Sequence, residues 1–249
     1  MEICNKEFLK QYDFVISCEY GQYMTYALSK ASDNVVMYSG PYYNLFKLPF
    51  VSPIYDALFT KSINKNIKYK FVKSILAKEF LEGKGYTNVE SIGVALDIER
   101  FDADIELHPD TKKLTDYMQA NRCILYVGAL SDRKNYPFIL EVYKKVRRDN
   151  PDVRLVMIGK GEKRYVDKYM ATLTNVERNG IYWIERMENA QLKFVYPLAN
   201  AFLLPSKLEI FGMVLLESMY LGAPVVTSWN GDSSTLIYGR SSGIIVREF

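Results

Sequence analysis

The sequence predicts an α/β protein with parallel β-sheets, and two observations support this. From Cys123 onward, short runs rich in Val, Ile and Leu alternate with amphipathic stretches. Strands that alternate with helices of about 10–15 residues form right-handed βαβ units, which build a parallel sheet covered on both faces. Hydrophobic residues make up 49% of the 249 residues, which is enough for a sizeable core.

The second half of the chain carries the more regular part of this pattern and is typical of a Rossmann-like domain. Its expected strands are at 124–128, 154–159, 181–185, 201–205 and 224–226, and its expected helices are at 135–149, 162–175, 188–198 and 210–221. The chain ends at IIVREF, directly after a strand-like run. A doubly wound domain normally has closing helices after such a strand. We therefore expect this domain to be nearly complete and to lack only these helices.

The first half is less regular and has only three candidate strands. These are at 12–17, 34–40 and 89–97, with a helix at 21–31 and a long helical region from about 54 to 84. The polar run that follows is a natural linker. We therefore predict an incomplete Rossmann-like domain at 1–107, a linker at 108–120 and a nearly complete domain at 121–249.

Composition and charge exclude several classes of protein. A net charge of +3 provides no global field for nucleic acid. The three cysteines are far apart and lack CxxC spacing, so neither a disulfide framework nor a zinc cluster is expected, and His108, the only histidine, lies in the polar linker. The start contains charges throughout and no apolar run approaches 18 residues, which argues against a signal peptide and a membrane span. We expect a cytoplasmic protein without a metal site.

Two acidic residues, Glu209 and Glu217, make the segment PSKLEIFGMVLLESMYLGAPVV (205–226) the most informative one. We expect a strand end, a short loop and a helix that begins near Phe211. Eight helical residues rise about 12 Å, which is comparable to the span from a sugar ring to a ribose across a diphosphate. Helix N-termini attract phosphate, and a carboxylate suits a vicinal diol. The alternative is that Glu209 caps the helix and Glu217 is a solvated helix residue.

The E-x7-E spacing within EIFGMVLLESMYLGAPVV closely resembles the donor-site signature of family-four (group 1) retaining glycosyltransferases. The likeness covers residues 120–240, and more weakly the earlier part. It implies the GT-B type of fold, with two facing Rossmann-like domains, the acceptor domain first and the donor domain second. It also implies a nucleoside-diphosphate sugar as substrate, with no metal ion or other cofactor. By this resemblance Glu209 is a catalytic residue that holds the donor sugar, Glu217 holds the ribose, and further donor contacts come from Ile210, Phe211, Gly212 and Met213.

The segment YVGALSDRKN (126–135) resembles the family's first donor-domain loop. The family usually has an Arg directly after the Gly and a Lys five residues further on. Lys134 matches the Lys, whereas Ala129 stands at the Arg position, and the neighbouring Arg133 is the candidate substitute. We assign Lys134 and Arg133 as catalytic residues that stabilise the departing diphosphate. The alternative is an exposed basic turn before a helix.

Two more loops belong to the donor site by resemblance. Gly128 and Gly159 lie in turns after the first two strands of this half, and the turn GKGE that begins at Gly159 is near the nucleotide in the family. The segment WIERM matches the family's nucleobase-contacting segment, which makes Arg186 and Met187 candidate base contacts.

Further segments match the family by pattern and order. WNGDSSTLI (229–237) is similar to the family's Gly-rich loop beyond the helix, and we interpret Asp232 and Ser233 there as loop-capping residues rather than catalysts. YSGPYYN, KSILAKEFLEGKGY and IGVALDIERF resemble the end of an acceptor domain. Bacterial capsule and cell-wall polysaccharide glycosyltransferases are the most similar.

The resemblance also predicts missing parts and a membrane contact. Acceptor domains of the family begin with strands and a Gly-rich loop that the residues before YDFVIS do not supply, so we expect a chain truncated at both ends, or one that pairs with a second polypeptide. Between Lys61 and Lys84, seven lysines face two acids, interleaved with apolar residues. This basic stretch either rests on anionic lipid at the inner membrane face or is a core-facing helix with a solvated basic side.

Taken with the resemblance, the sequence predicts a retaining, metal-independent glycosyltransferase of the hexosyltransferase type. It would move a sugar from a nucleoside-diphosphate sugar to a hydroxyl of a growing, lipid-linked polysaccharide. One alternative is a non-catalytic donor-domain fragment or partner subunit that binds nucleotide sugar without turnover. Another is a sugar-nucleotide epimerase of the same architecture, which the segment EIFGMVLLE disfavours.

Overall fold

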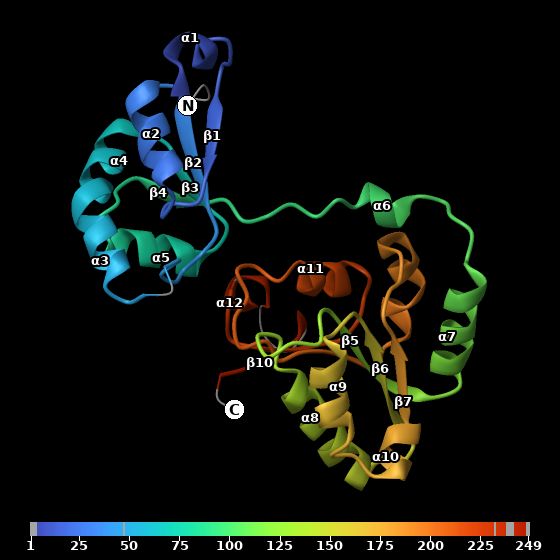
Figure 1. Cartoon of the computed structure of the whole chain (residues 1–249). Helices are drawn as coiled ribbons and strands as arrows, with labels where there is room; N and C mark the ends of the chain where they lie inside the picture. The colour runs from blue at the N-terminus through green and yellow to red at the C-terminus, as the bar shows by residue number, and fades with distance from the viewer. Residues whose placement is uncertain (1–3, 47, 232, 238–241, 248–249) are drawn as a thin grey trace. The chain divides into compact units, whose positions relative to one another are not determined.

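The computed structural model describes residues 4–46, 48–231, 233–237 and 242–247. The chain divides into two compact units, unit 1 (Met1–Val94) and unit 2 (Ala95–Phe249). Each unit has its own parallel sheet (Figure 1). Each also has its own hydrophobic core. The predicted α/β fold with two parallel sheets is therefore confirmed.

Unit 1 contains a four-stranded parallel sheet in the order β1-β2-β3-β4. Its elements are α1 (Lys6–Leu9), β1 (Val15–Cys18), α2 (Tyr23–Ala31), β2 (Val35–Ser39), α3 (Val51–Tyr55), the π-helical η2 (Asp56–Thr60), α4 (Lys61–Asn66), β3 (Lys70–Val72), α5 (Ile75–Gly83) and β4 (Val89–Ser91). Each strand is added on the same side of the previous one, so right-handed crossovers place the connecting helices on one face of the sheet. Figure 1 shows α2, α4 and α5 on that side.

The opposite face of this sheet is apolar and open among the described residues. We call it the open sheet face; its residues are Phe14, Ile16, Val36, Tyr38, Tyr69, Phe71 and Ile92. Phe14, Ile16 and Ile92 are largely exposed, so no described part of the chain covers these side chains. Because parallel sheets normally bury both faces, unit 1 lacks one of its two covering layers within the described part of the chain.

The prediction of a continuous helical region at 54–84 is wrong in the middle of that range, where β3 pairs in parallel with both β2 and β4. The strand is short and places a lysine, Lys70, on its buried side, so it does not show the apolar pattern of a central strand. Ile63 and Ile67 of the predicted basic amphipathic stretch are fully buried in the core of unit 1. For these two residues the core-facing alternative is therefore correct.

Unit 2 contains a six-stranded parallel sheet in the order β10-β9-β8-β5-β6-β7. Its strands are β5 (Arg122–Val127), β6 (Val153–Ile158), β7 (Ile181–Ile184), β8 (Ala201–Leu204), β9 (Val225–Ser228) and β10 (Ile244–Val246). Its helices are α6 (Glu99–Asp102), α7 (Pro109–Gln119), α8 (Tyr136–Asp149), α9 (Lys163–Met170), α10 (Asn175–Asn179), the 3₁₀-helical η3 (Asn189–Phe194) and η4 (Tyr196–Leu198), α11 (Met213–Tyr220) and α12 (Ser233–Leu236).

The strand order of unit 2 reverses between β5 and β8. The chain adds β6 and β7 on one side of β5, then returns to add β8, β9 and β10 on the other side. In open α/β sheets, ligands bind beyond the carboxyl ends of the strands at such a reversal. The fold alone thus places a candidate site where the loops that follow β5 and β8 separate.

The linker predicted at 108–120 is wrong, because most of it forms α7. Buried Leu114 and Met118 of this helix belong to the core of unit 2, and so does Phe101 of α6. Large apolar residues are sparse in PDTKKLTDYMQ, which made the helix resemble a polar linker. The division between the units lies at Val94 rather than at 107.

Candidate functional site

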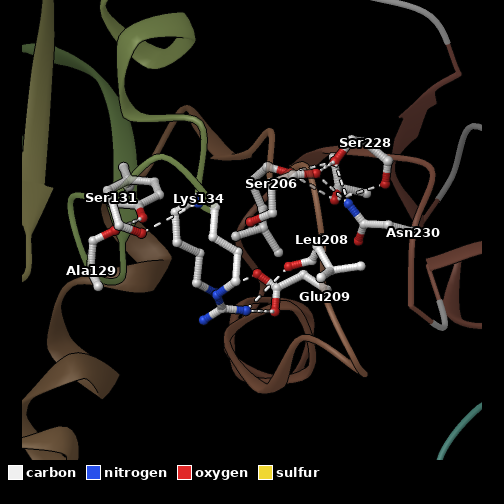
Figure 2. A network of polar contacts seen from close by, with 12 residues as sticks. Ala129, Ser131, Lys134, Ser206, Leu208, Glu209, Ser228 and Asn230 are labelled. Atoms are coloured by element: carbon white, nitrogen blue, oxygen red, sulfur yellow. Dashed lines mark hydrogen bonds and ion pairs between the residues drawn. The ribbon is translucent and has the colours of Figure 1, made fainter. Parts of the chain in front are cut away.

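A buried ion pair lies at the strand reversal of unit 2 (Figure 2). Lys134, in the loop after β5, donates from Nζ to Oε1 of Glu209, in the loop after β8. The two residues are only 8% and 5% exposed. Burying two charges costs free energy that even a close ion pair recovers only in part. A buried pair is therefore more typical of a functional site than of a contact that stabilises the fold.

Arg133 adds a second positive charge beside Glu209. Its Nη1 lies 3.7 Å from Oε2 of Glu209 and donates to the carbonyl oxygen of Leu208 at 3.2 Å. The side chain of Arg133 is half-exposed, and its own carbonyl accepts from the backbone N–H of Lys207 at 2.9 Å. One carboxylate therefore faces two cations, which leaves an excess positive charge at the edge of the sheet. The structure brings together all three predicted catalytic residues.

The loop that carries Glu209 is held from the β9 side by a polar network (Figure 2). The carbonyl of Ser206 accepts from Oγ of Ser228 at 2.6 Å and from the side-chain amide of Asn230. Asn230 also donates to Oγ of Ser228 at 2.7 Å. This network fixes the backbone three residues before Glu209, and none of its members was among the predicted site residues.

The loop after β9 approaches the same segment closely. A Cβ at Gly231 would lie 2.9 Å from the carbonyl oxygen of Glu209, so only glycine fits there. Ser233 accepts from the backbone N–H of Asn230 at 3.2 Å, which confirms its loop-capping role. Asp232, assigned the same role, lies outside the described residues.

The two glycine turns after β5 and β6 touch each other. A Cβ at Gly159, whose φ is +151°, would lie 1.9 Å from the carbonyl oxygen of Gly128. Next to this contact, the hydroxyl of Tyr126 donates to the carbonyl of Ala129 at 2.8 Å. The position where the family carries Arg thus contributes a backbone carbonyl held by a buried tyrosine. Gly159 is required by loop packing, whatever it contributes to a ligand.

Helix α11 begins at Met213, not near Phe211 as predicted. Gly212, with φ of 89°, precedes it, and no side chain of the described residues caps the helix start. Glu209 therefore does not cap α11, and that alternative is wrong. Ile210 is half-buried, Phe211 is buried and Met213 is exposed. An uncapped helix start beside two cations favours an anionic ligand.

Glu217, in the second turn of α11, is buried at 6% exposure, so it is not a solvated helix residue. Burial raises the pKa of its carboxyl, and the guanidinium of Arg100 acts in the opposite direction. Arg100 Nη2 lies 3.4 Å from Oε1, and the hydroxyl of Tyr196 donates to Oε2 at 3.4 Å. From Met213 to Glu217 the helix rises only about 6 Å, half of what was expected from eight helical residues.

The sequence did not predict these two partners of Glu217. Arg100 comes from α6, in a stretch assigned to the first domain, and it precedes Glu217 by more than a hundred positions. Tyr196 begins a short 3₁₀-helix and is fully buried. No local signal in the sequence connects either residue to a carboxylate on α11.

Arg186 and Met187 follow β7, at the far edge of the sheet. Two strands, β5 and β6, separate β7 from β8, which puts β7 about 14 Å from β8 at ordinary strand spacing. Arg186 is exposed, whereas Met187 packs partly against the core. The predicted base contacts therefore lie along the same carboxyl edge as the ion pair, but at its other end.

Comparison with known proteins connects this geometry to a family. The sequence model of the family described as glycosyl transferases group 1 matches residues 115–248, more than half of the chain. An uncharacterized glycosyltransferase of Haemophilus influenzae is 30% identical over 106 residues, which cover 43% of this chain and 29% of that protein. The D-inositol 3-phosphate glycosyltransferase of Segniliparus rotundus is 30% identical over 131 residues, 51% of this chain and 29% of that one. The match spans under a third of the length of either relative.

Solved structures show the same fold. The crystal structure of Alr3699/HepE from Anabaena in complex with UDP superimposes with a TM-score of 0.76 at 18% identity, covering 97% of this chain and 66% of that one. The apo structure of OtsA gives a TM-score of 0.75 at 13% identity, with 97% and 64% covered. Both units thus have the folds found in GT-B glycosyltransferases, and with the family match over its second unit the chain belongs to the glycosyl transferases group 1 family.

Proposed function

We propose that this chain forms the donor-sugar part of a retaining glycosyltransferase, which moves a hexose from a nucleoside-diphosphate sugar to a hydroxyl of a lipid-linked polysaccharide. The observation that carries the proposal is the buried Lys134–Glu209 pair at the strand reversal. Glu209 lies four residues before Met213, where the uncapped helix α11 begins. Cations and free backbone N–H groups at one place suit a diphosphate.

The donor would rearrange the charges of this site. An ammonium has three N–H donors and a carboxylate has two acceptor oxygens, so Lys134 and Glu209 both keep capacity for a ligand. Lys134 and Arg133 would bind diphosphate oxygens and stabilise the negative charge that grows as the leaving group departs. Glu209 would accept hydrogen bonds from hydroxyls of the sugar. These positive groups come from the protein itself, so we propose that no metal ion or other cofactor takes part.

The nucleoside would extend from this point along the site. Glu217 would accept both ribose hydroxyls, with Arg100 keeping it ionised against the effect of burial. Arg186 and Met187 would contact the base. One structural relative, HepE, is described in complex with UDP and with UDP-glucose, which supports a uridine nucleotide as the first ligand to test.

A second candidate function is a subunit that binds nucleotide sugar without turnover. The observation that favours it is the open sheet face of unit 1, where a covering layer would belong. A second polypeptide that completes unit 1 would then supply the acceptor side. Turnover that appears only when such a polypeptide is added would support this candidate.

The experiment is a calorimetric titration of the purified chain with UDP-glucose and GDP-mannose. Saturable binding of one donor is expected, because the site provides contacts for diphosphate, ribose and base. Glu217→Gln should weaken it, since the amide is uncharged and has one acceptor oxygen in place of two, whereas the exposed Glu141→Gln should bind as the unmodified chain does. Equal affinity of all three proteins would refute the assignment of Glu217. Addition of EDTA should leave the affinity unchanged.

A further inference from the structure

The helical segment from α3 through η2 to α4 presents an apolar stripe to the outside of unit 1. Phe50, directly before α3, is 60% exposed, Ile54 is 54% exposed and Leu58 is 64% exposed. The three residues are four positions apart, so they lie along one side of the helix. Lys61 and Lys65 continue the same side and are exposed. We call these five residues the outward stripe.

The outward stripe is not part of the core of unit 1, because a different side of the helix packs against that core. Tyr55 and Ile63 are buried in that core, and Thr60 is buried beside them. Nor does the stripe belong to the open sheet face, since the helices lie on the other face of the sheet and bury their inner sides against it. A layer that packed on the open sheet face would therefore leave the outward stripe exposed.

Charge complementarity indicates what covers it. Asp56 is the only acidic residue between Phe50 and Asn66, and its carboxylate is paired with Lys84. The exposed charges of the helix are thus lysines, gathered at its carboxyl end after the apolar half. Tyr23 of α2 extends the apolar half, since its exposed ring lies 5.8 Å from that of Phe59. Aromatic and aliphatic side chains beside lysines are typical of a helix that lies in the plane of an anionic membrane surface.

We propose that the outward stripe docks unit 1 onto an anionic lipid bilayer. Phe50, Ile54 and Leu58 would enter the headgroup region, and Lys61 and Lys65 would contact acidic headgroups. No described helix is long and apolar enough to span a bilayer, so this contact is an interfacial one for the described part of the chain. The role of this contact rests on the proposed function, because docking on a bilayer would bring the enzyme to a lipid-linked acceptor. The lipid contact itself requires neither bound donor nor turnover.

The test is cosedimentation of the purified chain with extruded vesicles. Vesicles of phosphatidylcholine alone are compared with vesicles that also contain phosphatidylglycerol, at low and at high salt. We expect binding to the anionic vesicles that weakens with salt. Lys61→Glu with Lys65→Glu should reduce it by roughly fivefold or more per lysine. Ile54→Ser with Leu58→Ser should reduce it by about tenfold.

The matched control is Phe14→Ser with Ile16→Ser, which removes similarly exposed apolar groups from the open sheet face. This variant should bind vesicles as the unmodified chain does. The proposal is overturned if the unmodified chain does not sediment with anionic vesicles, or if only the control variant loses binding. Nucleotide titration without vesicles tests the donor site separately, so a failure of one proposal is distinguishable from a failure of the other.

Discussion

The two sheets of this chain differ in the direction in which strands are added, and that difference decides both their packing and their chemistry. In unit 1 every strand is added on the same side, so the helices cover one face and the other is open among the described residues. In unit 2 the order reverses at β5 and β8. Crossovers in the two directions place helices on opposite faces, and the loops that separate at the reversal bring Lys134 and Glu209 together. One topological feature thus provides the second covering layer and the site.

The largest expected effect separates the buried sheet from the open one. Leu125→Ala, in the core of unit 2, should lower the free energy of unfolding by about 2–5 kcal/mol, because it leaves a cavity between helices and strands. Phe14→Ala, on the open sheet face, should change it by less than about 0.5 kcal/mol, since that side chain is already in water. Chemical denaturation of both variants measures this. Equal losses would show that the open sheet face is covered.

A smaller effect is expected at the contact of the two glycine turns. Gly159→Ala should cost about 2 kcal/mol, because its Cβ would overlap the carbonyl of Gly128 and its φ is unfavourable for alanine. Gly222→Ala is the control: its φ is also positive, but nothing lies within 4 Å of the added Cβ, so only about 1 kcal/mol is lost. Thermal unfolding compares the two. A cost at Gly159 no larger than at Gly222 would contradict the close contact.

The smallest expected effect concerns Glu217 and has the opposite sign. Burial raises the pKa of the Glu217 carboxyl in the folded chain, so as pH rises the unfolded chain loses this proton at a lower pH than the folded chain. The free energy of unfolding therefore falls as pH rises from the ordinary glutamate pKa through the raised pKa of the folded chain. The free energy of unfolding of Glu217→Gln should therefore exceed that of the unmodified chain by about 1 kcal/mol near pH 7 and equal it below about pH 4, while nucleotide binding is weakened. Arg100 is partly exposed and can be solvated in the variant. Denaturation at both pH values checks this, and a loss of stability near pH 7 would show that the pair with Arg100 outweighs burial.

The sequence predicted what depends on local pattern. The alternation of strands and helices predicted the parallel sheets, and the resemblance of the segments around Glu209 and Lys134 to a known family predicted that these two residues belong to one site. It did not predict β3, because pairing with two neighbouring strands, rather than apolar character, stabilises a strand with a buried lysine.

Contacts between distant segments were not predictable either. Arg100 and Tyr196 meet Glu217 only through the fold. The apolar part of the outward stripe was missed for another reason. Phe50, Ile54 and Leu58 have the spacing of a core-facing side, and only their exposure distinguishes them from one.

Titration of Lys134→Ala with UDP examines whether the charged pair at the strand reversal binds a diphosphate. The variant leaves Glu209 buried beside Arg133 alone, so a loss of about 3 kcal/mol in stability is expected and is measured first, with the exposed Lys145→Ala as control. If the variant remains folded at the temperature of the titration, UDP binding should be lost, whereas Lys145→Ala should bind UDP as the unmodified chain does. Unchanged affinity for UDP in folded Lys134→Ala would show that this charged pair does not bind the diphosphate.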